Sequence, residues 1–182
     1  MSTAPTSAEA RIARVDPTQA DPMLRESFDE FIRVRGKVPN LFRITGQRPA
    51  IGRTLAAHLR AVMDEGDVPT ALKELLAVRV SQVNDCEYCL ASHSRLAKRA
   101  GATDAQIQAL AGGIVSDMEP TWRAPLRAAE EMTRNHGAIS DATYEALRAD
   151  WSEPQIVEIV SVVSLFNLFN RTANALRIPP TV

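Results

Sequence analysis

Hydrophobic residues recur at intervals of three and four along almost the whole chain, and no convincing alternating segment of the kind that forms strands interrupts them. This spacing gathers apolar side chains on one face of a helix. The chain is therefore predicted to be all-α, with breaks at glycine and proline. Between the first two helices, residues 38–43 are predicted to form a turn and a short irregular element. The predicted helices cover approximately residues 22–35, 49–64, 69–83, 86–100, 104–111, 121–136, 141–150 and 153–177.

Local signals mark the ends of these segments. Asn84 and Asp85 are candidate N-caps for the helix that carries both cysteines. Thr103 and Ser152 each begin a pattern typical of a capping box. The last segment, 153–177, is apolar on all sides, which is expected of the central helix of a bundle or of a helix at a subunit interface.

The composition fits one soluble globular domain. The chain has 182 residues and a mass of 19.9 kDa, with 45% hydrophobic and 24% charged residues, and a chain of this size buries a core without disulfide bonds. Residues 1–20 are predicted to be a loosely ordered N-terminal lead, and residues 21–182 a single helical domain. Residues 1–17 lack the apolar run of a signal peptide or a membrane span, so we expect a cytoplasmic protein.

The balance of charge argues against polyanionic partners. Lys and Arg number 21 against 22 Asp and Glu, which gives a formal net charge of -1. Along the chain no basic cluster forms a stripe that could neutralise phosphates or an anionic bilayer. We therefore expect neither nucleic acid nor a membrane as a partner.

One group of residues has the spacing of a redox site. Cys86 and Cys89 are the two cysteines of the chain, His93 follows the second by four residues, and Glu74 lies twelve residues before the first. Within a helix the cysteines and the histidine share one face, and free amides at the helix start lower the pKa of a thiol there. Because the two cysteines would close too short a loop to stabilise a fold, a redox cycle or a metal suits them better.

The spacing suggests a role for each residue. Cys89, one turn before His93, is predicted to be the thiolate that meets an oxidant, with His93 taking its proton. Cys86 is predicted to attack the resulting sulfenic acid and form a disulfide. Glu74 belongs to the preceding helix, and spacing alone does not establish its contact. If that contact is made, the carboxylate would orient His93 or Cys86, or pass protons through them.

The pattern Glu74, Cys86-x-x-Cys89 and His93 resembles that of the AhpD-like alkylhydroperoxidases in the carboxymuconolactone decarboxylase superfamily. Two further stretches are similar to segments of its uncharacterised, peroxidase-related members: residues 38–42 and 166–176. The resemblance implies an AhpD-like bundle of about seven to eight helices. It implies a cofactor-free thiol peroxidase that reduces organic hydroperoxides or hydrogen peroxide. It also implies a trimer or hexamer, with a lipoyl or thioredoxin-like protein as electron donor.

Two features bear on that resemblance. The best-studied branch of the family has a second histidine between the cysteines, where this chain has Tyr88. A tyrosine with its unperturbed pKa of about 10 is a poor base, so Tyr88 is assigned an auxiliary role at most. Residues 158–177 can also be laid on residues 74–93, with a glutamate at the start of each, which would imply a degenerate duplication of a helical hairpin.

Other functions remain open. The cysteines could be unreactive core residues, or with His93 could supply three ligands to zinc in a non-enzymatic or redox-sensing module, although a closed zinc site needs a fourth ligand. His58 and His136 have no recognisable spacing for that role and are expected to be exposed or locally hydrogen-bonded. A carboxymuconolactone-type decarboxylase, with acid and base side chains acting on a lactone acid, is a further alternative. No metal or other cofactor is predicted.

Polar residues interrupt the apolar final segment. Asn167, Asn170, Arg171 and Asn174 need hydrogen-bond partners if they are buried. Three interpretations follow: contacts across a subunit interface, lining of a substrate pocket, or a face that is turned to solvent.

Overall fold

The computed structural model describes residues 10–64, 66–113, 115–116 and 118–181, and this part of the chain is all-α, as predicted. It contains two short 3₁₀-helices, at Pro17–Gln19 and Pro120–Trp122, and nine α-helices. The α-helices are α1 (Pro22–Arg35), α2 (Asn40–Thr45), α3 (Pro49–Met63), α4 (Thr70–Val83), α5 (Glu87–Arg99), α6 (Asp104–Ala111), α7 (Arg123–Arg134), α8 (Asp141–Asp150) and α9 (Glu153–Leu176).

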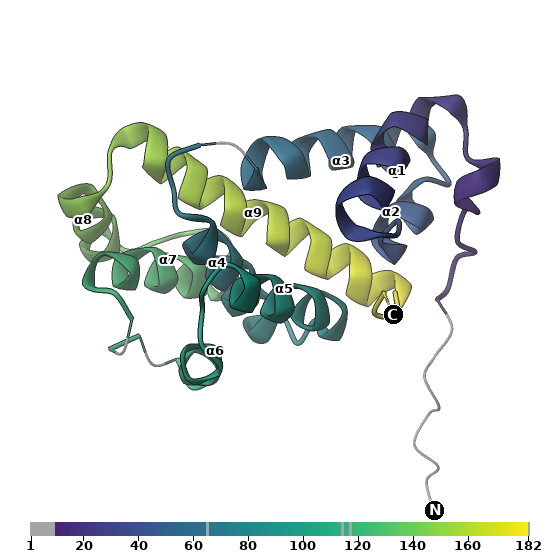
Figure 1. Ribbon diagram of the computed structural model, residues 1–182. Coiled ribbons are helices and arrows are strands. Elements are labelled where there is room, and N and C mark those ends of the chain that lie inside the picture. Colours follow the sequence, from purple (N-terminus) through teal and green to yellow (C-terminus); the bar gives the residue numbers. More distant parts are fainter. Residues whose placement is uncertain (1–9, 65, 114, 117, 182) are drawn as a thin grey trace, which may run out of the picture.

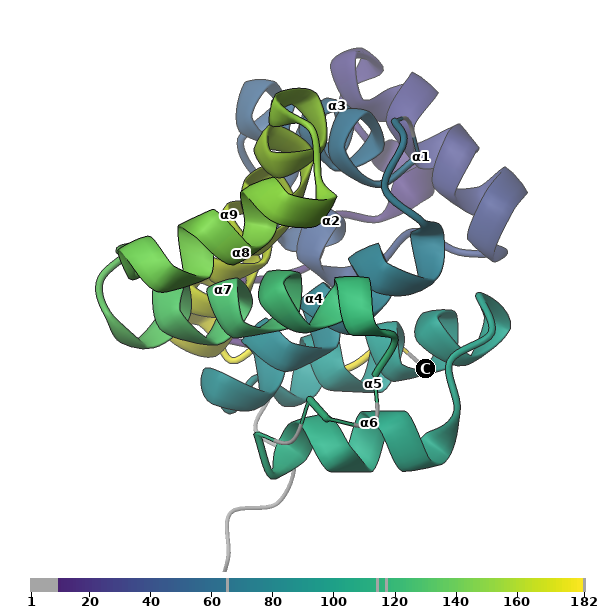
Figure 2. The ribbon, with the colours of Figure 1, turned by 90° about the vertical axis from the view of Figure 1, so that its left-hand side faces the viewer.

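Helix α9 runs through the centre of the molecule, as its apolar sequence predicts (Figure 1). The group formed by α1, α2 and α3 lies on one side of it, and α4, α5 and α7 pack on the other, which the turned view in Figure 2 also shows. Helix α4 is buried along most of its length because α5, α7 and α9 surround it. Fully buried side chains such as Leu75, Ile159 and Phe166 form the core between these layers.

By length and hydropathy α9 also meets the requirements of a membrane-spanning helix, and among the helices of the described ranges it is the one that does. Half of its apolar stretch is buried inside the fold. Because packed helices cover it from two sides, α9 has the surroundings expected of the core helix of a helical bundle.

Most predicted helix boundaries are confirmed, together with the capping chemistry. In the two predicted capping boxes, the side chains of Gln106 and Gln155 accept hydrogen bonds from the backbone amides of Thr103 and Ser152, at 2.9 and 3.0 Å. Gly36 ends α1 with a φ of +75°, a left-handed conformation that glycine adopts without strain.

Two local predictions were wrong. Residues 40–45 form a helix, α2, where an irregular element was expected, because the carbonyl of Pro39 accepts the first amides of the turn and the apolar side chains of α2 are buried in the core. The N-cap of α5 is Cys86 and neither Asn84 nor Asp85. Asp85 has a φ of +49°, whereas an N-cap residue has extended backbone.

The described segment before α1 is attached to the end of α9 and to α2. Residues 1–9, which are part of the expected loose lead, lie outside the described residues. The amide of Arg11 donates to the carbonyl of Leu176 at 2.9 Å, and the amide of Val15 donates to the carbonyl of Arg43 at 2.9 Å. Backbone hydrogen bonds therefore hold the described part of this lead in place.

Asn40 connects the start of α2 to the C-terminal tail. Its side-chain amide donates to the carbonyls of Pro179 and Pro180 at 3.1 and 3.2 Å, and its backbone amide donates to the Thr181 hydroxyl at 3.0 Å. These bonds satisfy a buried polar side chain and fix the tail against the N-terminal end of α2.

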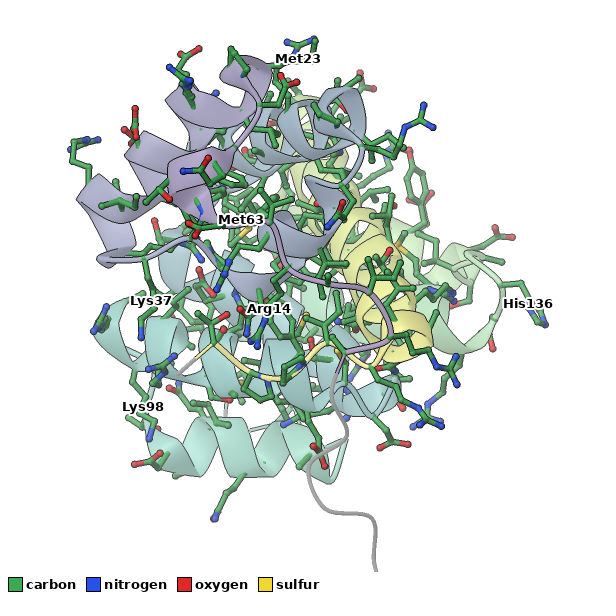
Figure 3. The ribbon with its side chains drawn as sticks, turned by 90° about the vertical axis from the view of Figure 1, so that its right-hand side faces the viewer. Arg14, Met23, Lys37, Met63, Lys98 and His136 are labelled. Atoms are coloured by element: carbon green, nitrogen blue, oxygen red, sulfur yellow. The ribbon has the colours of Figure 1, made fainter. Side chains whose placement is uncertain are left out.

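Charged side chains are spread over the surface, as Figure 3 shows. His136 projects from the edge of the molecule in that view, and both His136 and His58 are exposed, as predicted. Two cations are exceptions: Lys73 and Arg79 are 2% and 3% exposed. Both lie in α4, the helix that the others surround.

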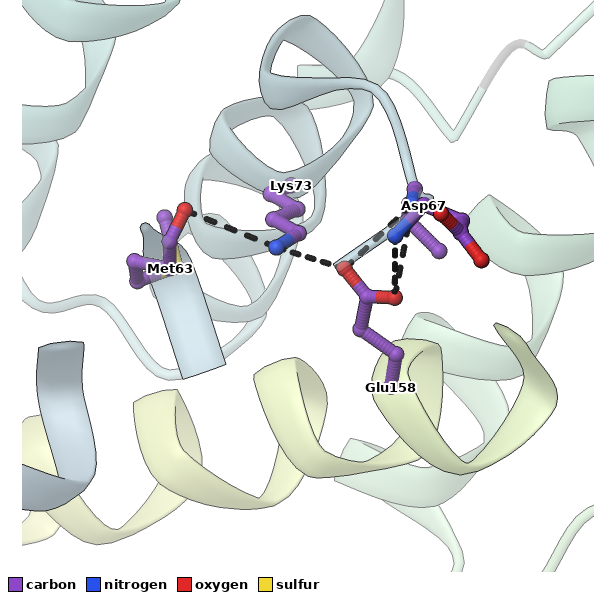
Figure 4. A network of polar contacts seen from close by, with 5 residues as sticks. Met63, Asp67, Lys73 and Glu158 are labelled. Atoms are coloured by element: carbon purple, nitrogen blue, oxygen red, sulfur yellow. Dashed lines mark hydrogen bonds and ion pairs between the residues drawn. The ribbon is translucent and has the colours of Figure 1, made fainter. Parts of the chain in front are cut away.

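Glu158 neutralises Lys73 inside the fold. The Nζ atom of Lys73 lies 2.5 Å from Oε1 of Glu158 and 3.5 Å from the carbonyl oxygen of Met63 (Figure 4). The same carboxylate accepts the backbone amides of Asp67 and Val68 at 3.0 and 3.3 Å. A buried charge is costly unless it is paired and hydrogen-bonded. Glu158 therefore fastens α9 both to α4 and to the loop that precedes α4.

Replacing Glu158 by glutamine should destabilise the fold strongly. The substitution keeps the shape of the side chain but removes the carboxylate charge that lies 2.5 Å from the buried Lys73 ammonium, and removing one partner of a buried ion pair costs about 3–5 kcal/mol. Urea unfolding followed by circular dichroism measures it. Glu145→Gln is the matched control, because Glu145 pairs with Arg148 on the surface at 3.6 Å and such pairs contribute at most about 1 kcal/mol. Equal effects of the two substitutions would contradict the argument.

Candidate active site

The turn between α4 and α5 brings Cys86 to the start of α5. The amide of Cys86 donates to the carbonyl of Ser81 at 2.9 Å, and the left-handed backbone of Asp85, a conformation that aspartate tolerates better than most residues, completes the turn. Cys86 is itself the N-cap, with extended backbone. Its sulfur therefore stands where the oxygen of an N-cap serine would stand, beside the free amides of the first turn.

Hydrogen bonds at this helix start lower the pKa of Cys86. The largest contribution is a hydrogen bond with the Cys89 thiol; burial opposes it, and the amides of Cys89 and Tyr88 and the side chain of Asn170 add to it. The pKa of Cys89 is raised, because the same hydrogen bond holds its proton and because the thiol is buried beside the charge of Cys86. The spacing predicts the thiolate at Cys89, whereas these contacts place the charge of the resting pair on Cys86.

Cys89 faces a cavity of about 210 Å³, and Cys86 is not among the residues that line it. The cavity lies between the N-terminal helices and α5, and α9 and the C-terminal tail complete its wall. Its apolar lining consists of Pro39, Leu41, Phe42, Leu59, Leu96 and Phe169. A molecule in this cavity therefore meets the sulfur of Cys89, and the charged sulfur of Cys86 lies behind it.

Glu74 and His93 form a buried pair between α4 and α5. Nδ1 of His93 lies 2.7 Å from Oε2 of Glu74, and the two residues are 7% and 6% exposed. The spacing in the sequence could not establish this contact between Glu74 and His93. The ring of Phe166 packs edge-on against the imidazole, with 4.5 Å between the ring centroids.

The pair leaves the second ring nitrogen of His93 available. His93 lines the cavity together with Cys89, and within the described ranges its Nε2 atom has no hydrogen-bond partner. A carboxylate on Nδ1 holds the imidazole in the tautomer that presents a free lone pair at Nε2. His93 can therefore accept or return a proton on the cavity side.

Tyr88 holds the first turn of α5 against α2. Its hydroxyl oxygen accepts the backbone amide of Leu41 at 3.1 Å and shares a hydrogen bond with Thr181. Burial raises the pKa of Tyr88 to about 12, so the phenol stays protonated at neutral pH. These contacts give Tyr88 a positioning role, because its phenolate is even less populated at neutral pH than that of an exposed tyrosine.

Asn170 is a site residue that sequence reasoning did not assign. It is fully buried, its side chain contacts both thiols, and its amide nitrogen donates to the Ser81 hydroxyl at 3.1 Å. Its Oδ1 atom accepts from the side chain of Asn84 at 3.1 Å. The signal was visible as a polar residue in an apolar helix. None of the three interpretations that the sequence left open describes Asn170, which is buried and contacts both thiols within the chain.

The neighbouring polar residues of α9 differ in burial. Asn167 is half-buried and accepts a hydrogen bond from the exposed Arg171 at 2.6 Å, and Asn174 is exposed and donates to the carbonyl of Asn84 at 2.9 Å. They support the α4–α5 turn without contacting the thiols.

The described residues include no group of three or more His, Cys, Asp or Glu side chains that could hold a metal ion. Cys86, Cys89 and His93 are therefore not gathered there into the three-ligand zinc cluster that their spacing allowed.

The structure thus brings together the four residues on which the resemblance to the AhpD-like proteins depends. The carboxymuconolactone decarboxylase family matches residues 49–131, which include all four of these residues. The uncharacterized protein YdfG of Bacillus subtilis (strain 168) is 26% identical over 127 residues, which make up 69% of this chain and 86% of YdfG. Over residues 49–131 the chain is therefore similar to the carboxymuconolactone decarboxylase family, and its fold is AhpD-like.

Two solved structures show how fully the fold is shared. An AhpD-core, peroxidase-related protein from Ralstonia eutropha JMP134 superposes with a TM-score of 0.84 and 24% identity, covering 94% of this chain and 92% of that one. The debrominase Bmp8 superposes with a TM-score of 0.82 and 21% identity, with the same coverage of 94% and 92%. A cysteine-to-alanine form of Bmp8 is known in complex with 2,3,4-tribromopyrrole. At these identities both likenesses establish the fold alone.

The lowered pKa of Cys86 predicts a thiolate at pH values where free cysteine is protonated. Ultraviolet thiolate absorbance of the reduced protein should rise with a midpoint below about 8.5, the value of free cysteine. Because the pKa is depressed, the anion is present above that midpoint and is lost as the pH falls through it. Cys89→Ser should keep a low midpoint, since serine still donates a hydrogen bond, whereas Cys86→Ser should retain only a transition above 8.5. The reverse order of the two variants would place the charge on Cys89.

Proposed function

We propose that the chain is a thiol-dependent peroxidase, which reduces organic hydroperoxides or hydrogen peroxide by cycling Cys86 and Cys89 between dithiol and disulfide. The observation that carries the proposal is the position of Cys89. Its sulfur faces a cavity, shares a hydrogen bond with a second thiol, and is followed one turn later by His93. A peroxide can reach the sulfur through the cavity, the second thiol can resolve a sulfenic acid, and the imidazole can exchange a proton.

The first step transfers one oxygen atom. The proposed step begins once His93 has accepted one thiol proton at Nε2, so that one proton remains between the two sulfurs. A shift of the shared proton from Cys89 to Cys86 along their hydrogen bond makes the cavity-facing sulfur the nucleophile. It attacks the outer peroxide oxygen, the O–O bond breaks, and His93 returns its proton to the departing alkoxide. The products are an alcohol and a sulfenic acid at Cys89.

The second step closes the disulfide. The sulfur of Cys86 attacks that of Cys89, the S–O bond breaks, and the hydroxide leaves as water with the proton of Cys86. Two electrons have then passed from the dithiol to the peroxide. The ordinary thiol exchange that restores the dithiol needs an external dithiol, and a lipoyl or thioredoxin-like protein is the donor that the family resemblance suggests.

The setting of the enzyme follows from the same resemblance. We propose a cytoplasmic homo-oligomer, a trimer or hexamer, that works without a cofactor and binds neither nucleic acid nor a membrane. A reducing compartment suits a thiol pair that must be recycled.

The family name keeps a decarboxylase as the competing function. The Glu74–His93 pair could perform acid–base chemistry without help from the thiols. Replacing both cysteines by serine separates the two functions, because a decarboxylase would keep its activity and a thiol peroxidase would lose all of it.

One equivalent of cumene hydroperoxide should consume both thiols of the reduced wild-type protein, and Cys89→Ser should consume almost none, because the remaining sulfur does not face the cavity. Free-thiol titration before and after the peroxide measures this. Cys86→Ser is the matched control: it should lose its single thiol and form a sulfenic acid that dimedone traps. If Cys86→Ser were inert and Cys89→Ser reactive, the roles of the two cysteines would be exchanged.

A further inference from the structure

Four cationic side chains surround the cavity that Cys89 faces. Arg35 and Lys37 come from the end of α1 and the loop after it, and Arg95 and Arg99 come from α5. No Asp or Glu is among the lining residues that the structure describes. Since the whole chain has 21 basic and 22 acidic residues, these four cations, here called the basic rim, are a local excess of positive charge.

The basic rim is not neutralised within the described part of the chain. Arg35 lies over the ring of Phe31 at 5.8 Å, and Nε of Arg95 donates to the carbonyl of Ala91 at 3.0 Å. Every ion pair observed there involves other basic side chains. Cations beside an apolar concavity raise the local concentration of anions.

The basic rim has two sides that face each other. Arg95 and Arg99 are four residues apart and share one face of α5, and the segment with Arg35 and Lys37 forms the opposite wall. Figure 3 shows Lys37 between the N-terminal helices and α5, and Lys37 also lines an adjoining hollow with Arg14. A ligand in the cavity would therefore meet positive charge on both sides.

The same cavity also has an apolar part. Leu41, Phe42, Leu59 and Phe169 line it together with the four cations and Cys89. At about 210 Å³ the cavity is smaller than the roughly 300–1,000 Å³ of pockets for drug-sized ligands. This size favours a single ring or a short chain over a long acyl chain.

We infer that the site takes a small anionic amphipath: an organic hydroperoxide whose apolar body fills the cavity and whose carboxylate, or a comparable anionic group, lies at the basic rim. Arginine suits this role because its planar fork binds a carboxylate through two hydrogen bonds. That the ligand is a peroxide rests on the proposed function. That it carries an anionic group rests on the cations of the cavity alone.

An acidic electron-donor protein is the competing occupant of the basic rim. Cys89 is 1% exposed, and the cations belong to the lining of a concavity. A small molecule can enter such a space and contact all its walls, whereas a protein surface would cover its mouth. The geometry therefore favours the small molecule.

Binding of unreactive probes tests the charge preference without any redox chemistry. By calorimetry, 4-isopropylbenzoate should bind the reduced wild-type protein at least about 10-fold more tightly than its neutral amide, a difference of ~1.4 kcal/mol. Arg95→Gln/Arg99→Gln should abolish that difference. Arg25→Gln/Arg53→Gln is the matched control, because it removes two exposed arginines outside the cavity, and it should preserve the preference. Equal binding of the two probes, or equal losses in both double variants, would overturn the inference.

Turnover then connects the charge to the reaction. Cumene hydroperoxide and its para-carboxylate differ only in the anionic group, and the carboxylate should have a KM about 10-fold lower in the wild type and in the control variant, but not in Arg95→Gln/Arg99→Gln. If the benzoate binds selectively while neither peroxide consumes thiols, the proposed function fails and the anionic ligand class stands. If Arg95→Gln/Arg99→Gln slows only the reduction of the disulfide by thioredoxin, the basic rim belongs to a protein and the inference fails.

Discussion

The hydrogen bond between Cys89 and Cys86 is the interaction on which the site depends. Because of this hydrogen bond the two sulfurs differ. The sulfur of Cys86 holds the negative charge beside the amides of α5, and the sulfur of Cys89 lies in the cavity wall. The difference survives only in a buried site, because water would compete for both the anion and the proton. The surrounding helices and Asn170 therefore belong to the chemistry as well as to the fold.

Local sequence signals were sufficient for most of the fold. The apolar period of α1, the cap at Ser140 before α8 and the capping box of α9 are each encoded within a few residues, and each was predictable. Helix α2 was missed because six residues carry too little periodicity and their helix depends on burial. The same limit explains Cys86: which residue caps α5 depends on the α4–α5 turn as a whole, including the left-handed Asp85.

The residues of the candidate site could be predicted from the sequence, but which sulfur carries the negative charge could not. Glu74, the cysteines and His93 follow from spacing and family resemblance, but the contact of Glu74 with His93 requires two helices to pack in a particular register. One of the side chains that hydrogen-bond the thiols is Asn170, which is 81 residues after Cys89 in the chain. The basic rim was invisible for the same reason, because its cations come from two separate segments and form no cluster in the sequence.

Tyr88 connects the first turn of α5, which carries Cys89, to the opposite wall of the cavity. The residue stands next to Cys89 in the chain, and its hydroxyl accepts the amide of Leu41, a residue of the opposite wall. A displacement of the first turn of α5 would therefore also shift the α2 side of the cavity. In the proposed peroxidase cycle, a disulfide formed in that turn would change the shape of the cavity that an incoming molecule meets.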